Sequence, residues 1–444
     1  MNNRTIVALS TPPANGAIHI IRVNGDDAYK IVNAIIDKKI KPIGYSIDHA
    51  NIIDKNKVID DVLIMKFVKP KSFTGEDLIE INCHGGLYLA TKIINLLIKN
   101  GAVLAKPGEF SKVAFINKKI DANQCHAINN LINSTNEESI NYSTLGLSKQ
   151  NTQKILQHIS KVFNLIGQVE VNIDYPEYDD VPNITRKKFI NELKSIKEDL
   201  EKTIINSQNG IKIHSGFNLA IIGEPNAGKS SLLNVLVNEE KAIVSNIKGT
   251  TRDVIEAKVN IKGMTFNILD TAGIRNKTSN PIEKIGISKT IDTIKNADCV
   301  IIVVDGTKKQ TNLKSILKLV KDKKYIIAIN KYDLLQKTKI PGAINISAKQ
   351  NKIDELIKKI IAFSNSFKMK ENNSALVHSK AAIGYIESAK EKLEQCIKSL
   401  KENKPIDLIT NNLHDVHDDL LKVIGQSENY DFIDEMFSKF CLGK

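Results

Sequence analysis

The 444-residue sequence contains no tryptophan, five arginines and five cysteines. The cysteines are odd in number, widely spaced and without a CxxC pair, at Cys83, Cys125, Cys299, Cys396 and Cys441. This pattern argues against a disulfide framework or a structural zinc site and favours a reducing cytoplasm. The chain also lacks an apolar run of about 18 residues and a basic N-terminal region followed by a long apolar stretch. We therefore expect neither a membrane span nor a signal peptide.

The scarcity of arginine changes how the net charge is interpreted. Lys and Arg together number 63 and Asp and Glu 50, which gives a formal charge of +13 and suggests a nucleic-acid partner. Nearly all of the basic residues are lysines, however, and we interpret most of them as solvated surface charge. Forked recognition of phosphate or carboxylate needs arginine. The arginines are therefore the more informative positions: Arg4, Arg22, Arg186, Arg252 and Arg275.

The apolar pattern changes three times along the chain and predicts four segments. Residues 1–118 mix short β-rich runs with helical spacing, which indicates an α+β domain. Residues 119–211 carry long amphipathic stretches typical of a helical bundle. Residues 212–367 alternate strand, loop and helix, which predicts a largely parallel sheet covered on both faces. Because residues 368–444 are helical again, we expect one helical domain interrupted by an inserted α/β domain.

More local patterns give the expected elements of the first two segments. Strands are predicted within residues 5–10, 17–23, 62–68 and 77–83, where apolar and β-branched residues gather between turn signals. Helices are predicted over 28–36 and from 87 to a stop near Gly101. Residues 124–146 are predicted as one amphipathic helical stretch.

The strongest chemical motif is GEPNAGKS, from Gly223 to Ser230. It follows a predicted strand and precedes a helical run, which is the setting of a phosphate-binding loop. Its glycines allow successive N–H groups to face phosphate oxygens, and the helix N-terminus favours the anion. Lys229 supplies a positive charge for the β- and γ-phosphates, and the Ser230 hydroxyl can bind Mg²⁺.

Four further motifs follow in the order of a GTPase. GTTRD offers Thr250 or Thr251 as the Mg²⁺-sensing hydroxyl of a switch loop. DTAG begins with Asp270 after a strand, where an acid can hold Mg²⁺ through water. In NKYD, Asp333 can accept hydrogen bonds from the N1 and N2 donors of guanine. Adenine lacks this pair of donors, so its binding would leave the carboxylate unpaired. The triplet 347–349, which begins with Ser347, follows another strand, and a backbone N–H there suits a contact to guanine O6.

The inserted domain therefore resembles the translation-factor class of small GTPases. One departure is Ile274, which stands where Ras-like enzymes carry a glutamine that orients the attacking water. In cation-dependent members of this class, the asparagine that matches Asn226 helps bind K⁺ beside the phosphates. The bound cation can neutralise charge that develops there. A turn-forming role for Asn226 is the alternative.

Motifs outside that domain extend the resemblance to essentially the whole chain. These are the segments 6–25, 72–86, 106–124 and 173–177 and the terminal CLGK of 441–444. They occur in the order found in the tRNA uridine-5-carboxymethylaminomethyl modification GTPase family, MnmE (TrmE). The resemblance implies a cytoplasmic homodimer and an FAD-dependent partner, MnmG (GidA), in a heterotetramer or larger complex. It also implies modification at C5 of U34 in certain tRNAs, with K⁺-dependent GTP hydrolysis driving a conformational change.

The resemblance also assigns roles to individual residues. A 5-formyl-tetrahydrofolate or a related one-carbon folate would be bound by Arg22, Glu80, Lys119 and Lys444. Paired donors on the pterin suit Glu80, and the glutamate tail suits Arg22 or a lysine. Glu283, in PIEKIG, matches a glutamate that positions the attacking water, although this chain carries one residue more than the family pattern before it. Without the family, Glu283 would be a first-turn helix acid.

The complete set of expected site residues follows from these motifs. The catalytic positions are Glu283, Lys229 and Asn226. Mg²⁺ would be held by Ser230 and Thr251, and K⁺ by Asn226, Ser245, Ile247 and Thr250. Cys441 is either a functional thiol or a packing residue. The GTP-binding positions are Asn226, Ala227, Gly228, Lys229, Ser230, Ser231, Ser245, Asn246, Ile247, Lys248, Gly249, Thr250, Thr251, Asp270, Thr271, Ala272, Gly273, Asn330, Lys331, Asp333, Ser347, Ala348 and Lys349.

Two other functions share part of this pattern. A ribosome-assembly GTPase acting as an RNA-binding switch shares the phosphate loop and the hydrophobic residue after DTAG. Such proteins usually add an RNA-binding module, and neither a KH pattern nor a second GTPase domain is recognisable here. The second alternative is a one-carbon folate enzyme regulated by GTP, which would turn over folate without tRNA.

Overall fold

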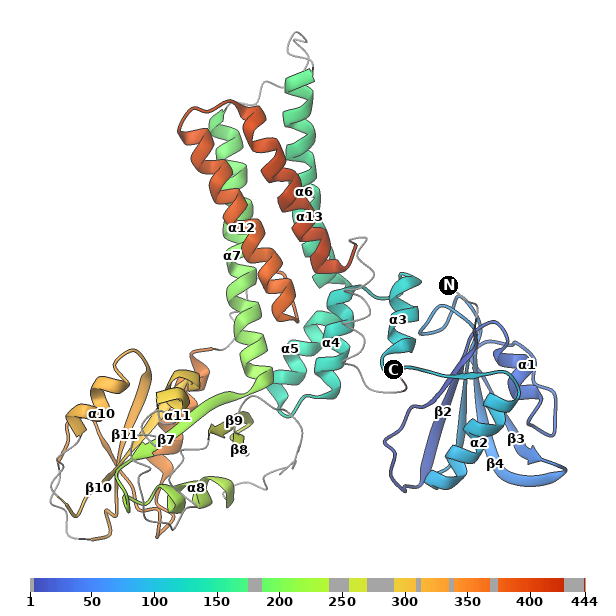
Figure 1. Cartoon of the computed structure of the whole chain (residues 1–444), viewed down its shortest axis with the longest axis horizontal. Coiled ribbons are helices and arrows are strands. Elements are labelled where there is room, and N and C mark those ends of the chain that lie inside the picture. Colours follow the sequence, from blue (N-terminus) through green and yellow to red (C-terminus); the bar gives the residue numbers. More distant parts are fainter. Residues whose placement is uncertain are drawn as a thin grey trace.

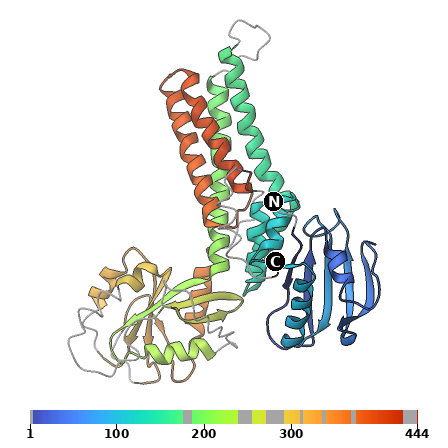
Figure 2. The same cartoon turned by 45° about the vertical axis from the view of Figure 1, so that its right-hand side comes forward.

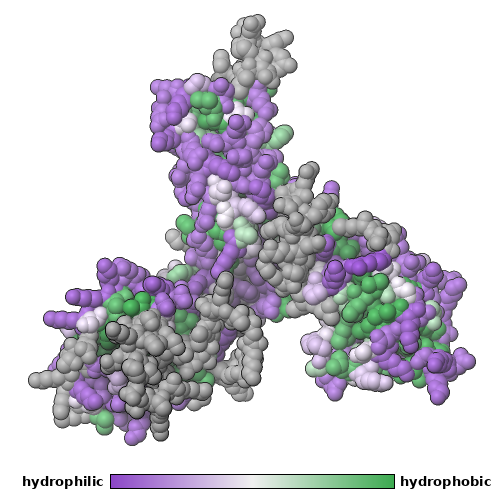
Figure 3. All heavy atoms as spheres, viewed as in Figure 1, coloured by the Kyte–Doolittle hydropathy of each residue, from purple (hydrophilic) through white to green (hydrophobic). Residues whose placement is uncertain are grey.

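The computed structural model describes residues 4–174, 186–238, 255–269, 291–308, 313–334, 339–367, 374–426 and 443. A tall helical bundle stands between two sheet domains, one formed by the N-terminal segment and one by the inserted segment (Figures 1 and 2). The outer surface of the upper bundle is largely hydrophilic, whereas apolar side chains gather on the visible face of the N-terminal domain (Figure 3). The three expected parts are therefore distinct bodies along one chain.

The N-terminal domain is a six-stranded sheet with the order β3-β4-β5-β2-β1-β6. Strand alternation divides its side chains between two faces. One face, which carries Ile21 and Ile81, packs against α1 and α2 and forms a buried apolar core with them. The strands are β1 (Ile6–Leu9), β2 (Ile18–Asn24), β3 (Ser46–Asp54), β4 (Lys57–Phe67), β5 (Leu78–His84) and β6 (Val103–Leu104). The helices are α1 (Ala28–Asn33), α2 (Leu87–Lys99) and α3 (Glu109–Ile116).

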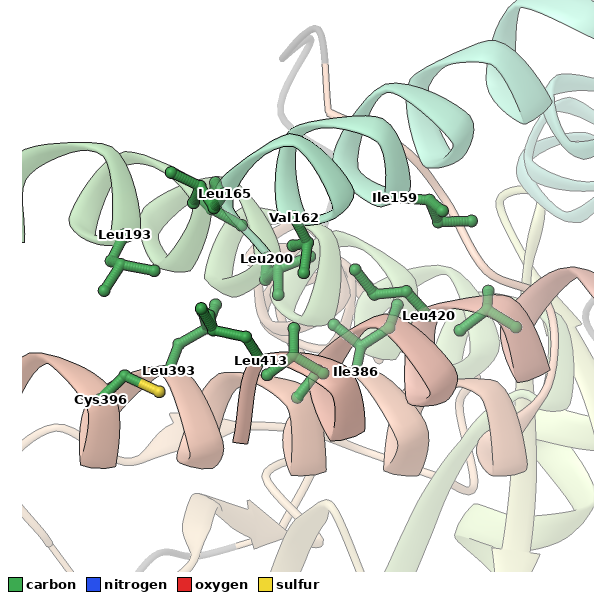
Figure 4. Close-up of a cluster of buried hydrophobic side chains, with 14 of the residues drawn as sticks. Ile159, Val162, Leu165, Leu193, Leu200, Ile386, Leu393, Cys396, Leu413 and Leu420 are labelled. Atoms are coloured by element: carbon green, nitrogen blue, oxygen red, sulfur yellow. The ribbon is translucent and has the colours of Figure 1, made fainter. Parts of the chain in front are cut away.

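The helical domain combines segments from both sides of the inserted domain, as expected. Its core is an apolar cluster from four long helices, and Figure 4 shows Val162, Leu200, Leu393 and Leu413 pointing toward one another. Each of these side chains is at most 1% exposed. The domain comprises α4 (Ala122–Ile132), α5 (Glu137–Leu147), α6 (Lys149–Asp174), α7 (Arg186–Ser215), α12 (Lys380–Lys401), a 3₁₀ turn η1 (Ile406–Ile409) and α13 (Thr410–Ile424).

An extended segment, 374–379, leads from the inserted domain back into the helical domain. Buried side chains bind its backbone. Asn151 donates to the Leu376 carbonyl and accepts from the Leu376 N–H, each at 2.8 Å, and the Tyr142 hydroxyl donates to the Val377 carbonyl at 2.6 Å. The exit of the inserted domain is therefore fixed to the helical bundle by polar contacts.

The inserted domain has the predicted, largely parallel sheet, in the order β12-β11-β10-β7-β9-β8. Of the described strands of this sheet, β8 alone runs antiparallel to its neighbour. Buried apolar clusters lie on both faces. The strands are β7 (Phe217–Gly223), β8 (Ile255–Ile261), β9 (Met264–Leu269), β10 (Cys299–Asp305), β11 (Lys324–Asn330) and β12 (Ile344–Asn345), and the helices include α8 (Lys229–Asn238), α10 (Leu313–Leu319) and α11 (Asp354–Asn365).

Some details differ from the sequence predictions. The stretch 124–146 is two helices, because Asn136 accepts from the Ser139 N–H at 2.7 Å and caps a new helix there. Helix α1 ends at Asn33 rather than at 36, and β3, β6 and α3 were not predicted. Helix α7 runs to Ser215, so the expected domain boundary at 212 lies within its last turn.

Candidate nucleotide and folate sites

The predicted phosphate loop joins the end of β7 to the N-terminus of α8. Gly223 leaves no room for a side chain, since a Cβ there would lie 2.1 Å from the carbonyl oxygen of Val303. Asn226 is exposed and left-handed, with φ 62°. The loop therefore turns directly into a helix whose first N–H groups have no intrahelical acceptor, and this end of the helix is suited to an anion.

Lys229 folds back over the loop that precedes it. Its Nζ donates to the carbonyl oxygens of Gly223 at 3.0 Å and Glu224 at 2.9 Å. Burial lowers the pKa of Lys229, because the charged form is partly removed from water. A phosphate beside this ammonium would compensate for that desolvation. The next residue, Ser230, is exposed, so its hydroxyl is accessible.

The motifs predicted to bind guanine meet at the ends of β11 and β12. Asn330 is 3% exposed, and its Nδ2 donates to the Ala227 carbonyl at 2.9 Å. Its Oδ1 accepts from the Ala348 N–H at 3.0 Å. The Ser347 hydroxyl donates to Asp333 at 2.6 Å. One buried amide thus connects the phosphate loop with both predicted base-recognition segments.

The carboxylate of Asp333 is oriented for recognition while remaining exposed. The hydrogen bond from Ser347 lowers the pKa of Asp333, and Lys349 and Lys352 contribute in the same direction. The ionised form, which the predicted contact with guanine requires, is therefore favoured. This local order fits the predicted role of the NKYD motif.

An ion pair beside this motif was not predicted. Lys331, with φ 65°, places its Nζ 2.7 Å from Asp305 at the end of β10. Burial raises the pKa of Asp305, but hydrogen bonds from Lys331 and Thr307 outweigh it and leave the pKa lowered. An acid at a strand end was the available sequence signal, yet its partner depends on the alignment of Asp305 with Asn330 across the sheet.

Many expected GTPase positions lie outside the described residues. These are Ser245, Asn246, Ile247, Lys248, Gly249, Thr250, Thr251, Asp270, Thr271, Ala272, Gly273, Ile274 and Glu283, together with Arg252 and Arg275. The same holds for Cys441 and Lys444.

The predicted folate residues Arg22 and Glu80 face each other across β2 and β5. Arg22 donates to Glu80 from Nε at 2.9 Å and from a terminal guanidinium nitrogen at 2.6 Å. A second guanidinium nitrogen donates to the carbonyl oxygen of Gly443, in the terminal CLGK motif, at 3.2 Å. The guanidinium carbon also lies 5.5 Å from the ring centre of Phe110. The two residues therefore form one partly buried unit, where the sequence analysis gave each a separate part of the folate.

The predicted Lys119 lies near the segment that precedes β5. Its Nζ donates to the Pro70 carbonyl at 2.9 Å, and its side chain passes 3.3 Å from where a Cβ on Gly75 would lie. No hydrogen bond between Lys119 and Arg22 or Glu80 occurs among the described residues.

The sheet face that carries Arg22 and Glu80 is only partly covered. Phe110 of α3 covers one end. Along the rest, strand alternation places Ile18, Ile47 and Leu63 on this same face, and they are 59%, 62% and 46% exposed. Exposed apolar side chains beside a partly buried ion pair suit a ligand or a protein partner.

Among the described residues, neither the cysteines nor potential metal ligands form a competing site. Cys83, Cys125, Cys299 and Cys396 are free and buried, and burial raises the pKa of each thiol. Across the described part of the chain, no group of three or more His, Cys, Asp or Glu residues is arranged to hold a metal ion. The described helices include none that is long and apolar enough to cross a membrane.

Comparisons with protein families cover both the first and the last parts of the chain. The model of the GTP-binding protein TrmE N-terminus matches residues 5–119. The model of the MnmE helical domain matches residues 123–441, which also spans the inserted domain. Together they account for most of the sequence.

Relatives match along their full length. The chain is 45% identical to the tRNA modification GTPase MnmE of Mycoplasmoides gallisepticum over 99% of this chain and 98% of that protein. It is 44% identical to the protein of the same name from Mycoplasma genitalium over 99% of each. The G domain of the T. maritima FeoB iron transporter aligns with 33% of this chain and 98% of its own, at 27% identity and a TM-score of 0.26.

Proposed function

The chain belongs to the MnmE family of tRNA modification GTPases, and we propose that it adds a carboxymethylaminomethyl group to C5 of U34 together with an FAD-dependent partner. It is a GTP hydrolase. In this proposal its G domain, the inserted domain of residues 212–367, supplies nucleotide cycling. The N-terminal domain of residues 1–118 supplies a one-carbon folate. The helical domain formed by 119–211 and 368–444 connects the two.

The G domain binds GTP through the motifs that the sequence analysis identified. The N-terminus of α8 and Lys229 bind the phosphates, and Asp333 with the segment 347–349 selects guanine. The single observation that best supports this proposal is the amide of Asn330, which joins Ala227 to Ala348 and so connects phosphate and base recognition. Glu283 positions the attacking water.

Two cations complete the proposed site. The exposed Ser230 hydroxyl, with Thr251, would hold Mg²⁺, and Asn226 with Ser245, Ile247 and Thr250 would hold K⁺. The chemistry fits the described residues, because hydroxyl and amide oxygens are hard ligands and both Ser230 and Asn226 are accessible. The cations would supply positive charge against the phosphates during hydrolysis.

The folate would lie on the open face of the N-terminal sheet. Arg22 and Glu80 are held together there, and Arg22 also donates to the carbonyl of Gly443, the residue that precedes Lys444 in the sequence. Lys119 would contribute a further positive charge. The carboxylate suits the paired donors of a pterin, and the cations suit the glutamate tail of 5-formyl-tetrahydrofolate. The folate would supply the one-carbon unit.

The same open face is the proposed homodimer surface. Ile18, Ile47 and Leu63 are exposed beside the folate residues, so burial against a second copy would remove apolar surface from water. A heterotetramer or larger assembly with the FAD-dependent MnmG would then perform the redox step on tRNA. The free, buried cysteines are compatible with a reducing cytoplasm.

Mass spectrometry of tRNA nucleosides tests the proposed function directly. Cells that lack this protein should lose the carboxymethylaminomethyl group from U34, and the full-length protein should restore it. A variant with Lys229→Ala should bind GTP weakly and fail to restore it, with Lys318→Ala in α10 as the matched control. Normal U34 modification in the deletion strain would refute the proposal.

A further inference from the structure

The β8–β9 hairpin of the G domain contacts the helical domain through a small polar cluster. Thr265, in β9, is 6% exposed. Its hydroxyl oxygen lies 2.9 Å from the Thr135 hydroxyl and accepts from Nδ2 of Asn136, also at 2.9 Å. Thr135 and Asn136 belong to the turn between α4 and α5. Residues about 130 positions apart in the sequence thus form a direct contact between two domains.

The helical side of this contact is tightly organised. Asn136 is 6% exposed and caps α5 through the Ser139 N–H. Its Nδ2 also donates to the Ile213 carbonyl near the end of α7, at 3.4 Å. The Ser139 hydroxyl lies 2.7 Å from Nδ1 of His214 on the same helix. A displacement of Thr265 would therefore be transmitted to the start of α5 and the end of α7.

The hairpin side leads to the nucleotide site. Strand β9 ends at Leu269, and the next residue is Asp270 of the DTAG motif; β8 begins at Ile255, four residues after Thr251. The turn between the strands is tight, since Lys262 and Gly263 have φ 48° and 78°. Thr265 is four residues from Leu269, about 13 Å along an extended strand. One end of the hairpin therefore continues into both switch motifs, and the other end touches the helical domain.

We propose that Thr265, with Thr135 and Asn136, couples the nucleotide state of the G domain to helices α4 and α5. These are positioning residues that act through the hairpin. The inference rests on the proposed function, in which GTP hydrolysis changes the conformation of the chain. It adds the route: movement of the hairpin alters its contact with Thr135 and Asn136, and so alters the capped end of α5.

Two other contacts join the last turn of α7 to the sheet of the G domain, one of them from Asn267 of β9 itself. Lys212 of α7 pairs with Asp298 at 2.5 Å, and Asn267 donates to the Ser215 carbonyl at 3.1 Å. These contacts lie at the covalent connection between α7 and β7. Removing the Thr265 hydroxyl should therefore leave the domains joined while it weakens the coupling.

Hydrogen–deuterium exchange of the full chain tests the coupling. Backbone amides of residues 134–146 are compared with GDP bound and with GDP plus fluoroaluminate bound, in potassium chloride. The wild-type chain should show a nucleotide-dependent change in exchange of about fivefold or more, the lower end of ordinary coupling between sites. Thr265→Val should reduce this change below about twofold, while Thr265→Ser, which keeps the hydroxyl, retains it. The GDP affinity of both variants should equal that of the wild type.

A matched substitution distinguishes a loss of coupling from a general loss of stability. Thr203 is 1% exposed in α7, and its hydroxyl donates to the Asp199 carbonyl within that helix. Thr203→Val should keep the nucleotide-dependent change. A full change in Thr265→Val, no change in the wild type, or an equal loss in Thr203→Val would overturn the proposal. A wild-type chain that shows the change but modifies no tRNA would refute the proposed function and leave the coupling standing.

Discussion

Asn330 and Ala227 join the two halves of the proposed nucleotide site. Nδ2 of Asn330, at the end of β11, donates to the Ala227 carbonyl in the phosphate loop at 2.9 Å. The close approach requires a glycine next to Ala227, because a Cβ on Gly228 would lie 2.1 Å from the same Nδ2. Since Asn330 also accepts from the Ala348 N–H, one buried side chain sets the spacing between phosphate loop and base pocket.

Asn330→Ala should therefore weaken nucleotide binding, because it removes the link between the phosphate loop and the segment 347–349. It leaves the Ala227 carbonyl and the Ala348 N–H without this partner, and an unpaired buried group costs about 1–3 kcal/mol. We expect GDP affinity to fall by about tenfold or more. Titration with a fluorescent GDP analogue measures the effect. Asn345→Ala, at an exposed position of β12, is the control, and wild-type affinity in Asn330→Ala would contradict the assigned role.

Asp333→Asn should change which base the site accepts. An amide cannot accept from both guanine N1 and N2, whereas it can pair with xanthine, which presents an oxygen in place of the amino group. We expect GTP affinity to fall at least about a hundredfold and xanthosine triphosphate to become the better substrate. Nucleotide turnover with each triphosphate decides this. Asp322→Asn, on the surface of the same domain, should keep guanine specificity, and unchanged GTP affinity in Asp333→Asn would exclude base reading by Asp333.

GTP turnover by the wild-type chain should depend on the monovalent cation. Asn226 is exposed in the phosphate loop, where its amide oxygen can bind K⁺. We expect the rate in KCl to exceed that in NaCl by about tenfold or more at equal ionic strength. Asn226→Ala should remove the difference by lowering the rate in KCl. Equal rates of the wild type in both salts would eliminate the cation role.

Arg22→Ala should abolish binding of 5-formyl-tetrahydrofolate while GTP binding is unchanged. The substitution removes the forked contact to Glu80 and the contact to Gly443, so it disrupts the proposed pocket as well as its charge. Isothermal titration calorimetry measures the binding of the folate. Arg4→Ala, which removes an ion pair with Glu109 in the same domain, serves as the control. A normal folate isotherm for Arg22→Ala would reject the pocket.

Features that depend on residues close together in the sequence could be predicted. The strands before Gly223 and Asn330 are short β-branched runs that end at their motifs, so spacing alone placed Lys229 and Asp333 at one edge of a parallel sheet. The buried helical core was also predictable, because amphipathic periodicity identifies the residues that face inward. Motif and periodicity are local properties of the chain.

Features that depend on register and tertiary packing were not predictable. Arg22 and Glu80 are 58 positions apart and meet only because β2 and β5 pair in one register. The break before α5 reflects a cap at Asn136, whose amide also reaches Thr265 in another domain. Residues 133–139 carry no apolar side chain, and Asn136 followed by two glutamates is a local signal of a helix start that the predicted single stretch did not take into account. The contacts of Arg22 with Glu80 and of Asn136 with Thr265 require the folded chain to bring the partners together.

The buried His378 should make the helical domain sensitive to acid. Its ring stacks on Tyr142 with centroids 4.2 Å apart, and Nε2 lies 2.9 Å from the Tyr142 carbonyl. Burial lowers the pKa of His378 to about 4, although that hydrogen bond opposes the shift, and His126 and His214 add a smaller lowering. The unfolded chain has an ordinary histidine pKa of about 6.5 and binds a proton that the folded chain does not bind. Stability from the neutral ring is thus complete above about pH 6.5 and decreases as the pH falls toward 4.

Integrated from pH 7.5 to 5.0, this histidine should reduce the free energy of unfolding by about 2 kcal/mol. Thermal melting of wild type and His378→Gln at the two pH values measures the contribution, because glutamine does not titrate. The variant should be less stable at pH 7.5 but lose less stability on acidification. His414→Gln, at an exposed position of α13, should follow the wild type. Parallel pH dependences of wild type and His378→Gln would show that protonation of this ring does not limit acid stability.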